Sequence, residues 1–288
     1  MKRTERFTDA TTIAPTARDA GAMLSLAWAG ILSTSQLRAL HYPSTRVAQR
    51  RLRALFDAGL VRVHVPSQRL SDESTYTLSP EGVALLEARG LVEEGSVDPA
   101  RTPRLQKLRH TLLCREPFVI LRRAEASGSL RLLDYQFDHD LSRVADLTKD
   151  GVILDGLAVV ERAGRTVALA IECDGGTETT TVLRQKCERL MSFMPLVPTL
   201  VGATSAQLLF IALTERRRAT IERLVVEIAL ADTRVIVLAD LASLVARGYP
   251  FGVFVRAVRA ERIPDDARTL GKATDPAPPR TAFRRAGG

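Results

Sequence analysis

Two apolar runs joined by a short turn constrain the fold of this chain more than any other stretch. Alternation and β-branched residues predict strands at about 152–162 and 165–173. The dipeptide Ala163–Gly164 between them predicts a two-residue hairpin turn, because glycine readily adopts the positive φ that such turns need. This turn sets a register in which Asp155 lies directly opposite Glu172, with Cβ atoms roughly 5 Å apart.

A third acid lies at the same end of the predicted sheet. Asp174 follows Glu172 by two positions and therefore shares its face. Three converging carboxylates repel one another, and hydrophobic packing gives no reason for them. A divalent cation would relieve the repulsion, and oxygen ligands suit Mg²⁺ or Mn²⁺. A bulge in the first strand would instead turn Asp155 elsewhere and leave solvated strand ends, so both interpretations stay open.

The composition favours a folded protein without a membrane span. Of the 288 residues, 45% are hydrophobic, which is enough for a sizeable core in two modest domains. The three cysteines are widely spaced and odd in number, so they indicate neither a disulfide framework nor a zinc site. The N-terminal segment lacks an apolar signal core, and no apolar run approaches the roughly 20 residues of a membrane helix. We therefore expect a cytoplasmic protein.

The net charge of +8 is distributed unevenly along the chain. Residues 1–109 carry 16 Lys and Arg against 11 Asp and Glu, residues 110–255 carry 17 against 18, and residues 256–288 carry 8 against 4. The basic excess therefore lies in the N-terminal part and the tail, which favours a polyanionic partner such as nucleic acid. An excess of this size is also common on ordinary protein surfaces.

Shifts in composition divide the chain into five segments. We expect a disordered arm at 1–17, an N-terminal domain at 18–92, a polar linker at 93–103, a second domain at 104–255 and a basic disordered tail at 256–288. The two folded domains are therefore expected to carry the function.

The N-terminal domain is predicted to contain three helices, a hairpin and a fourth helix. Ser33 and Gln36 form a capping-box signature that starts the second helix. Ser44 or Thr45 caps the third helix, and Ser79 caps the fourth. The third helix carries an apolar stripe on one face and four polar residues at helical spacing on the other: Arg46, Gln49, Arg50 and Arg53.

This order of elements resembles a winged helix-turn-helix. In that superfamily the third helix enters the major groove of double-stranded DNA, and the hairpin touches the DNA backbone. The resemblance implies that the basic face of the third helix reads bases, while Arg62 and Arg69 on the hairpin contact phosphates. The same arginines are compatible with a solvated helix face, and winged helices also dock proteins.

The second domain is predicted to begin with a helix that is interrupted near Pro117, followed by a strand near Leu130–Leu133 and an irregular acidic segment. Beyond the hairpin we expect a helix at 181–193, a buried strand at 208–214, a helix at 215–230 and a last strand at 235–241. The arginines at 216–218 place positive charge near the N-terminus of the 215–230 helix, where the helix dipole disfavours it. A phosphate partner or simple solvation would explain their presence.

This second order resembles the PD-(D/E)xK nuclease-like fold, a mixed sheet flanked by helices as in restriction endonucleases. The run 171–174 (IECD), with Gly176, Thr177, Glu178 and Lys186 after it and a winged helix before it, is similar to the replication-relaxation family over roughly residues 20–245. That family comprises bacterial plasmid and mobile-element proteins linked to plasmid replication and DNA relaxation. The expected fold class is therefore α/β, with an N-terminal winged helix-turn-helix and a restriction-endonuclease-like second domain.

The chain departs from the nuclease motif at one position. The motif reads Asp, then Glu-x-Lys; Asp155 and Glu172 fit it, whereas Asp174 stands in place of the lysine. The resemblance implies that Asp155 and Glu172 hold Mg²⁺ or Mn²⁺ and that Asp174 joins them or orients water. Lys186 on the following helix would bring the missing ammonium to the phosphate, and an ordinary surface lysine is the alternative.

Three functions stay open at this point. The first is a DNA-binding protein that is also a metal-dependent endonuclease or nickase. The second is a non-catalytic replication accessory protein or transcriptional regulator with a degenerate nuclease fold. The third is an interaction module of a mobile element, in which the winged helix docks a protein. A homodimer and other mobile-element proteins are further candidate partners. The sequence assigns no role to His110 or to the acidic segment Asp134–Asp140.

Overall fold

The chain folds into two compact units that divide between Val119 and Ile120, within one helix. The computed structural model describes residues 14–65, 73–98, 108–141, 154–228 and 235–238. The predicted tail 256–288 and the end of the predicted linker 93–103 lie outside these residues. The first helix already begins at Ala17, one residue inside the predicted arm.

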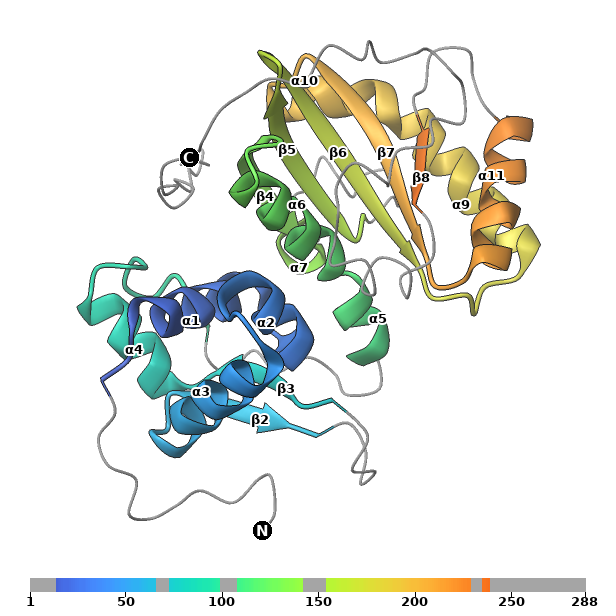
Figure 1. Cartoon of the computed structure of the whole chain (residues 1–288). Helices are drawn as coiled ribbons and strands as arrows, with labels where there is room; N and C mark the ends of the chain where they lie inside the picture. Colours follow the sequence, from blue (N-terminus) through green and yellow to red (C-terminus); the bar gives the residue numbers. More distant parts are fainter. Residues whose placement is uncertain (1–13, 66–72, 99–107, 142–153, 229–234, 239–288) are drawn as a thin grey trace. The chain divides into compact units, whose positions relative to one another are not determined.

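The first unit contains helices and a three-stranded antiparallel sheet of order β1-β3-β2 (Figure 1). Its elements are α1 (Ala17–Ala29), β1 (Leu32–Ser33), α2 (Thr34–His41), α3 (Thr45–Asp57), β2 (Val61–His64), β3 (Thr75–Leu78), α4 (Pro80–Ala88) and α5 (Leu108–Leu113). The helices and the hairpin follow the predicted order, and β1 is an additional strand. The predicted interruption is confirmed, because α6 (Glu116–Ala126) begins after a break and holds Pro117 in its first turn.

Serine caps fix the starts of three helices in this unit. The Ser33 side chain accepts a hydrogen bond from the Gln36 backbone, and the Gln36 side chain accepts one from the Ser33 backbone, so the predicted capping box is confirmed. Ser44, rather than Thr45, caps α3, and Ser79 caps α4. With its start fixed, α3 buries the predicted apolar stripe: Ala48, Leu52, Leu55 and Phe56.

A fully buried carboxylate holds α1 and α3 together. Asp19 accepts hydrogen bonds from the Thr16 backbone N–H at 2.8 Å, from the Thr16 hydroxyl at 2.7 Å and from the Tyr42 hydroxyl at 3.2 Å. It also forms an ion pair with Arg51 of α3. Burial by itself raises the pKa of Asp19, but the hydrogen bonds from Arg51 and Thr16 outweigh burial and lower the pKa.

Polar contacts also attach the segment around α5 to the first unit. The Gln36 side chain donates to the Leu112 carbonyl at 2.9 Å and to Glu116 Oε1 at 2.7 Å. Arg115 donates from Nε to the Ala29 carbonyl at 2.7 Å. These contacts place the chain up to the start of α6 with the N-terminal helices, which explains why the units divide inside α6.

The second unit is built on a five-stranded mixed sheet of order β4-β5-β6-β7-β8 (Figure 1). Neighbours from β4 to β6 are antiparallel, and those from β6 to β8 are parallel. Its elements are β4 (Arg131–Phe137), α7 (Asp138–Leu141), β5 (Gly156–Arg162), β6 (Arg165–Asp174), α9 (Thr180–Phe193), the 3₁₀ turn η2 (Met194–Leu196), α10 (Val197–Val201), β7 (Ser205–Ala212), α11 (Glu215–Ile228) and β8 (Val235–Leu238). Among the described helices of both units, none has the length and apolar character needed to cross a membrane.

Helices α9 and α11 share one hydrophobic core with a face of this sheet. The core includes residues of β5 to β7 and of both helices: Leu157, Ala170, Leu183, Leu190, Phe210 and Ile221. Since Ala168 and Ala170 of β6 face this core, so do the side chains at alternate positions further along the strand. The packing therefore brings the two helices over the end of β6.

The hairpin of β5 and β6 has the predicted turn and the predicted register. Ala163 and Gly164 have φ values of 49° and 71°, as a two-residue turn with two positive φ angles requires. Pairing continues without a shift along the whole of β5, and the Asp155 N–H donates to the Ile171 carbonyl at 3.0 Å. A bulge in the first strand, the alternative interpretation, is therefore excluded for the described part of the hairpin.

The acidic segment before the hairpin was predicted wrongly. We expected a strand near Leu130–Leu133 and irregular chain up to Asp140, whereas β4 continues to Phe137 and α7 follows directly. The register with β5 shifts between Leu132 and Asp134. Such a bulge interrupts the alternation of inward and outward side chains, which hides the second half of the strand from a period-2 pattern.

Candidate functional site

The end of β6 carries two buried acids. Glu172 and Asp174 are 1% and 3% exposed, and they lie on the face that α9 and α11 cover. Burying a carboxylate costs free energy unless a cation or hydrogen-bond donors compensate for the lost water. Each of the two acids has a cationic partner, and the partners come from different helices.

Asp155 directly precedes β5, beyond the last ladder pair of Gly156 and Ile171, and its N–H donates to the Ile171 carbonyl. Its Oδ2 accepts a 2.8 Å hydrogen bond from the backbone N–H of Cys173, which fixes the side chain beside the end of β6. Burial raises the pKa of Glu172 well above its ordinary value, and the charge of Asp155 raises it further. The two carboxyl groups therefore interact directly, as those of a shared ligand site do.

Lys186 of α9 reaches this pair of acids. Its ammonium forms an ion pair with Glu172 Oε1 and lies 3.5 Å from Oε1 of Glu178, just before the helix. Burial lowers the pKa of Lys186, but the contact with Glu172 and the negative charges of Asp155 and Glu178 together outweigh burial, and the pKa is raised. The same surroundings affect the neighbouring thiol: burial, and then the charge of Glu172, raise the pKa of Cys187 to about 12. Cys187 is thus a protonated packing residue.

One oxygen of Glu172 has no hydrogen-bond donor. Oε1 touches the Lys186 ammonium without hydrogen-bond alignment, and Oε2 is buried with no partner among the described residues. Buried polar atoms are rarely left unpaired, so this oxygen needs an explanation. A divalent cation fits: the donor set of Glu172 and Asp155 consists of carboxylate oxygens, which Mg²⁺ and Mn²⁺ prefer.

Asp174 is bound by Arg217. Nε and Nη2 of Arg217 donate to the two carboxylate oxygens, the second at 3.1 Å, and the Gly176 N–H donates to Oδ1 at 3.1 Å. Both oxygens are therefore satisfied within the protein. Arg217 was not predicted as the partner of Asp174, although the basic residues at the start of α11, against the helix dipole, were the signal for it.

Of the four residues predicted to read DNA from α3, three are exposed and one is held by an ion pair within the helix. Arg46, Gln49 and Arg50 are exposed. Arg53 forms a 2.8 Å ion pair with Asp57 one turn later, and its guanidinium also lies 5.4 Å from the centre of a neighbouring aromatic ring. The first three side chains are thus accessible to a large partner, whereas Arg53 is held along the helix.

Of the two arginines predicted to contact DNA from the hairpin, the structure describes only one. Arg62 lies on β2 and is half-buried. Arg69 lies outside the described residues. The hairpin therefore offers one described basic side chain beside the helix.

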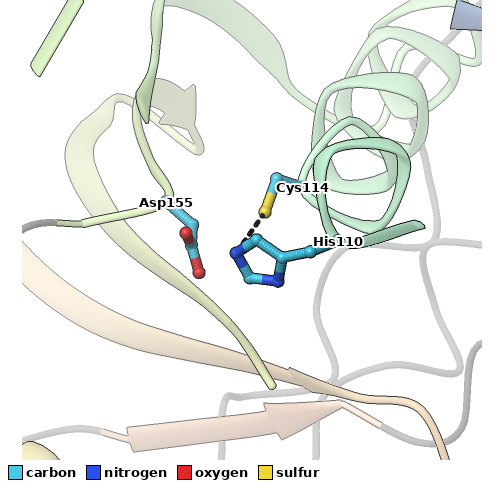
Figure 2. Close-up of side chains that lie close together, drawn as sticks. All are labelled: His110, Cys114 and Asp155. Atoms are coloured by element: carbon cyan, nitrogen blue, oxygen red, sulfur yellow. Dashed lines mark hydrogen bonds between the residues drawn. The ribbon is translucent and has the colours of Figure 1, made fainter. Parts of the chain in front are cut away.

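His110 and Cys114 lie one helical turn apart in the first unit. Cys114 Sγ is 3.4 Å from His110 Nε2, and Figure 2 shows this hydrogen bond. The third residue drawn there, Asp155, belongs to the second unit and to the hairpin already described. Since Cys114 is buried, this pair is a helix-packing contact of the kind expected from the i, i+4 spacing.

Comparison with known proteins gives two findings of different kinds. Two structures of restriction endonuclease FokI match, one of them bound to DNA. Their sequence identities are 11% and 12%, with TM-scores of 0.33 and 0.31; the matches cover 82% and 81% of this chain but only 45% and 44% of the endonuclease. No curated protein matches the sequence. The model of the replication-relaxation family matches residues 23–194, more than half of the 288 residues, and the chain belongs to that family.

Proposed function

We propose that this protein binds double-stranded DNA with its first unit and nicks DNA at the pair Asp155–Glu172 with Mg²⁺ or Mn²⁺. The observation that carries the proposal is the buried Glu172 oxygen without a hydrogen-bond donor in the described structure, next to the Cys173 N–H that holds Asp155. Membership in the replication-relaxation family fits a protein that acts on the DNA of a plasmid or another mobile element.

The chain supplies both the ligands and the charge for such a site. Asp155 and Glu172 would hold the cation from adjacent strands, in positions fixed by the hairpin ladder. When bound, Mg²⁺ or Mn²⁺ supplies a Lewis acid that polarises a phosphoryl oxygen and lowers the pKa of water. Lys186 contributes a positive charge beside the acids, where a phosphodiester anion would be stabilised. Burial of Glu172 strengthens these electrostatic interactions by excluding water.

The first unit provides the surface for duplex DNA. Its helices and hairpin have the order of a winged helix-turn-helix, in which the third helix reads the major groove. Arg46, Gln49 and Arg50 occupy the exposed face of α3, where they would contact base edges and phosphates. Because Arg53 is paired with Asp57, it contributes less to this contact than the other arginines.

A non-catalytic role in replication or transcription is the second candidate. One observation favours it: Asp174 stands at the position of the nuclease lysine, and it is bound on both oxygens by Arg217. In this case the metal site would stabilise the second unit without cleavage. Only the first candidate function produces a nicked plasmid.

Incubation with supercoiled plasmid separates the two candidates. The parent should convert supercoiled to open-circular DNA in millimolar Mn²⁺ and not in EDTA, whereas Asp155→Asn and Glu172→Gln should each lose roughly 100-fold or more of this rate. Glu161→Gln is the matched control, because Glu161 lies on the same hairpin but pairs with Arg131 at the exposed end. Absence of nicking by the parent with either metal would establish the non-catalytic candidate.

DNA binding is tested independently of cleavage. Arg46→Ala with Arg50→Ala should weaken duplex binding strongly and reduce the slope of log affinity against log salt by about 2. Arg18→Ala with Arg89→Ala removes the same charge from exposed positions on α1 and at the C-cap of α4 in the same unit, and it should change affinity little. Equal losses in both double variants would mean that α3 is not the contact surface.

A further inference from the structure

The ammonium group of Lys186 lies between two carboxylates of unequal burial. It is paired with Glu172, which is almost fully buried, and it is 3.5 Å from Glu178, whose side chain is 33% exposed. Glu178 immediately precedes Thr179, the N-cap of α9, so the helix start fixes its position relative to Lys186. The lysine thus has a partner inside the site and a second one at its rim.

Glu178, the partner nearer to solvent, has a carboxylate oxygen that is still available to accept a hydrogen bond. Oε2 of Glu178 is a buried atom without a hydrogen-bond partner in the part of the chain that the structure describes. A lysine side chain carries its charge on a flexible four-carbon stem with three donors, so it changes partners through rotations of the stem. Lys186 therefore reaches Glu178 more closely without a change in the backbone, and it keeps a carboxylate partner as it does so.

A divalent cation and this ammonium compete for the same carboxylate, the one through Oε2 and the other through Oε1. Both bind Glu172 at its buried end, and two positive charges a few ångströms apart repel strongly in a site from which water is excluded. Occupation of Glu172 by one cation therefore disfavours the other. Lys186 can move away, because Glu178 provides a second carboxylate within its reach.

We propose that Lys186 is an internal counter-ion of the metal site, and that a divalent cation replaces it on Glu172 while the ammonium moves to Glu178. This inference rests on the proposed metal site at Asp155 and Glu172. Without metal, Lys186 compensates the buried carboxylate, which otherwise repels Asp155. With metal, the ammonium is released to the rim, where it is accessible to a phosphate. Glu178 is then a positioning residue, since it acts on the site through Lys186.

The proposal predicts effects of opposite sign at the two ends of the contact. Lys186→Gln removes the competitor, so the protein should bind Mn²⁺ about tenfold more tightly. Glu178→Gln removes the alternative partner of the lysine, so Lys186 stays on Glu172 and Mn²⁺ binding should weaken several-fold. A merely structural role for the pair would make both substitutions unfavourable for binding.

Calorimetric titration of the full chain with MnCl₂ measures these affinities without any need for cleavage. Arg184→Gln is the matched control, because Arg184 lies on the same helix and pairs with Glu227 at an exposed position. It removes the same charge as Lys186→Gln and should leave the affinity within about twofold of the parent. An equal gain in Arg184→Gln and Lys186→Gln would mean that only net charge matters, which would overturn the proposal.

The double variant Lys186→Gln/Glu178→Gln tests whether Glu178 affects metal binding through Lys186. The alternative is that the negative charge of Glu178 attracts the metal ion directly. If Glu178 acts through the lysine, the double variant should bind Mn²⁺ as tightly as Lys186→Gln. If the loss caused by Glu178→Gln persists in the double variant, the exchange is wrong although the metal site stands. If neither the parent nor Lys186→Gln binds Mn²⁺, the proposed metal site and the exchange both fail.

Discussion

Two buried carboxylates, Asp19 in the first unit and Glu172 in the second, each have an ion-pair partner of their own. Their other contacts differ. Asp19 receives hydrogen bonds from Thr16, Tyr42 and Arg51. Burial raises the pKa of Asp19, but the contacts with Arg51 and Thr16 together lower it. Glu172 has Lys186 beside one oxygen, no hydrogen-bond donor at the other within the described structure, and a raised pKa. Both side chains are closed to solvent, and they differ in how completely the carboxylate is satisfied.

The difference separates a carboxylate that stabilises the fold from one that is available to a ligand. A satisfied buried carboxylate gains from its contacts, and its removal leaves the partner groups unpaired. An unsatisfied one destabilises the folded state until a cation supplies what the protein does not. Substitutions at the two sites should therefore have opposite consequences for stability.

The largest effect is expected from Asp19→Asn. It leaves Arg51 without its carboxylate and disrupts the bonds to Thr16 and Tyr42, so the free energy of unfolding should fall by about 3 kcal/mol. Glu172→Gln removes the repulsion with Asp155, so in EDTA this variant should be at least as stable as the parent. Urea unfolding followed by circular dichroism measures both.

These two variants also test the comparison itself. If Glu172→Gln in EDTA loses as much stability as Asp19→Asn, then Glu172 is a structural carboxylate like Asp19. The distinction between satisfied and unsatisfied acids would then have no consequence for this protein.

An intermediate effect is expected at Asp174, which resembles Asp19 although it lies two residues from Glu172. Arg217→Ala leaves this buried carboxylate without its cation and should lower the free energy of unfolding by about 2 kcal/mol. Arg216→Ala removes the same charge from an exposed position on the same turn of α11, and the expected change is within about 0.5 kcal/mol. Equal changes in the two variants would show that the contact with Asp174 adds no stability.

The smallest effect is expected in acid. Because the pKa of Asp19 is lowered by folding, its contribution is present above its ordinary value of 3.8 and is lost as the pH falls through the folded-state value. The parent should therefore lose stability more steeply than Asp19→Asn below about pH 4. Urea midpoints between pH 3 and pH 7 measure the two slopes, and parallel curves would contradict the assignment.

Local sequence signals predicted the elements that depend on neighbours in the chain. The capping box of Ser33 and Gln36 needs only a four-residue pattern. The hairpin register needs only the two-residue turn at Ala163 and Gly164, and it holds as far as the pair of Gly156 and Ile171, next to Asp155 and Glu172. The end of β4 was missed for a local reason as well, because a bulge breaks the alternation on which the prediction depends.

The site contacts that depend on packing between distant elements were not predictable in the same way. Arg217 and Asp174 are 43 positions apart, and their contact exists because α11 packs beside α9 on the same face of the sheet. The pair of Asp19 and Arg51 is 32 positions apart and joins α1 to α3. Lys186 was within reach of prediction, since its helix directly follows the strand that carries Glu172.

Thermal melting with and without millimolar Mn²⁺ tests the central claim, that Asp155 and Glu172 hold a divalent cation together. A ligand that binds only the folded state raises the melting temperature according to its concentration relative to its dissociation constant. The parent should melt several degrees higher with Mn²⁺ than in EDTA, and Asp155→Asn and Glu172→Gln should each lose this increase. An unchanged melting temperature in the parent, or an equal increase in all three proteins, would contradict the account.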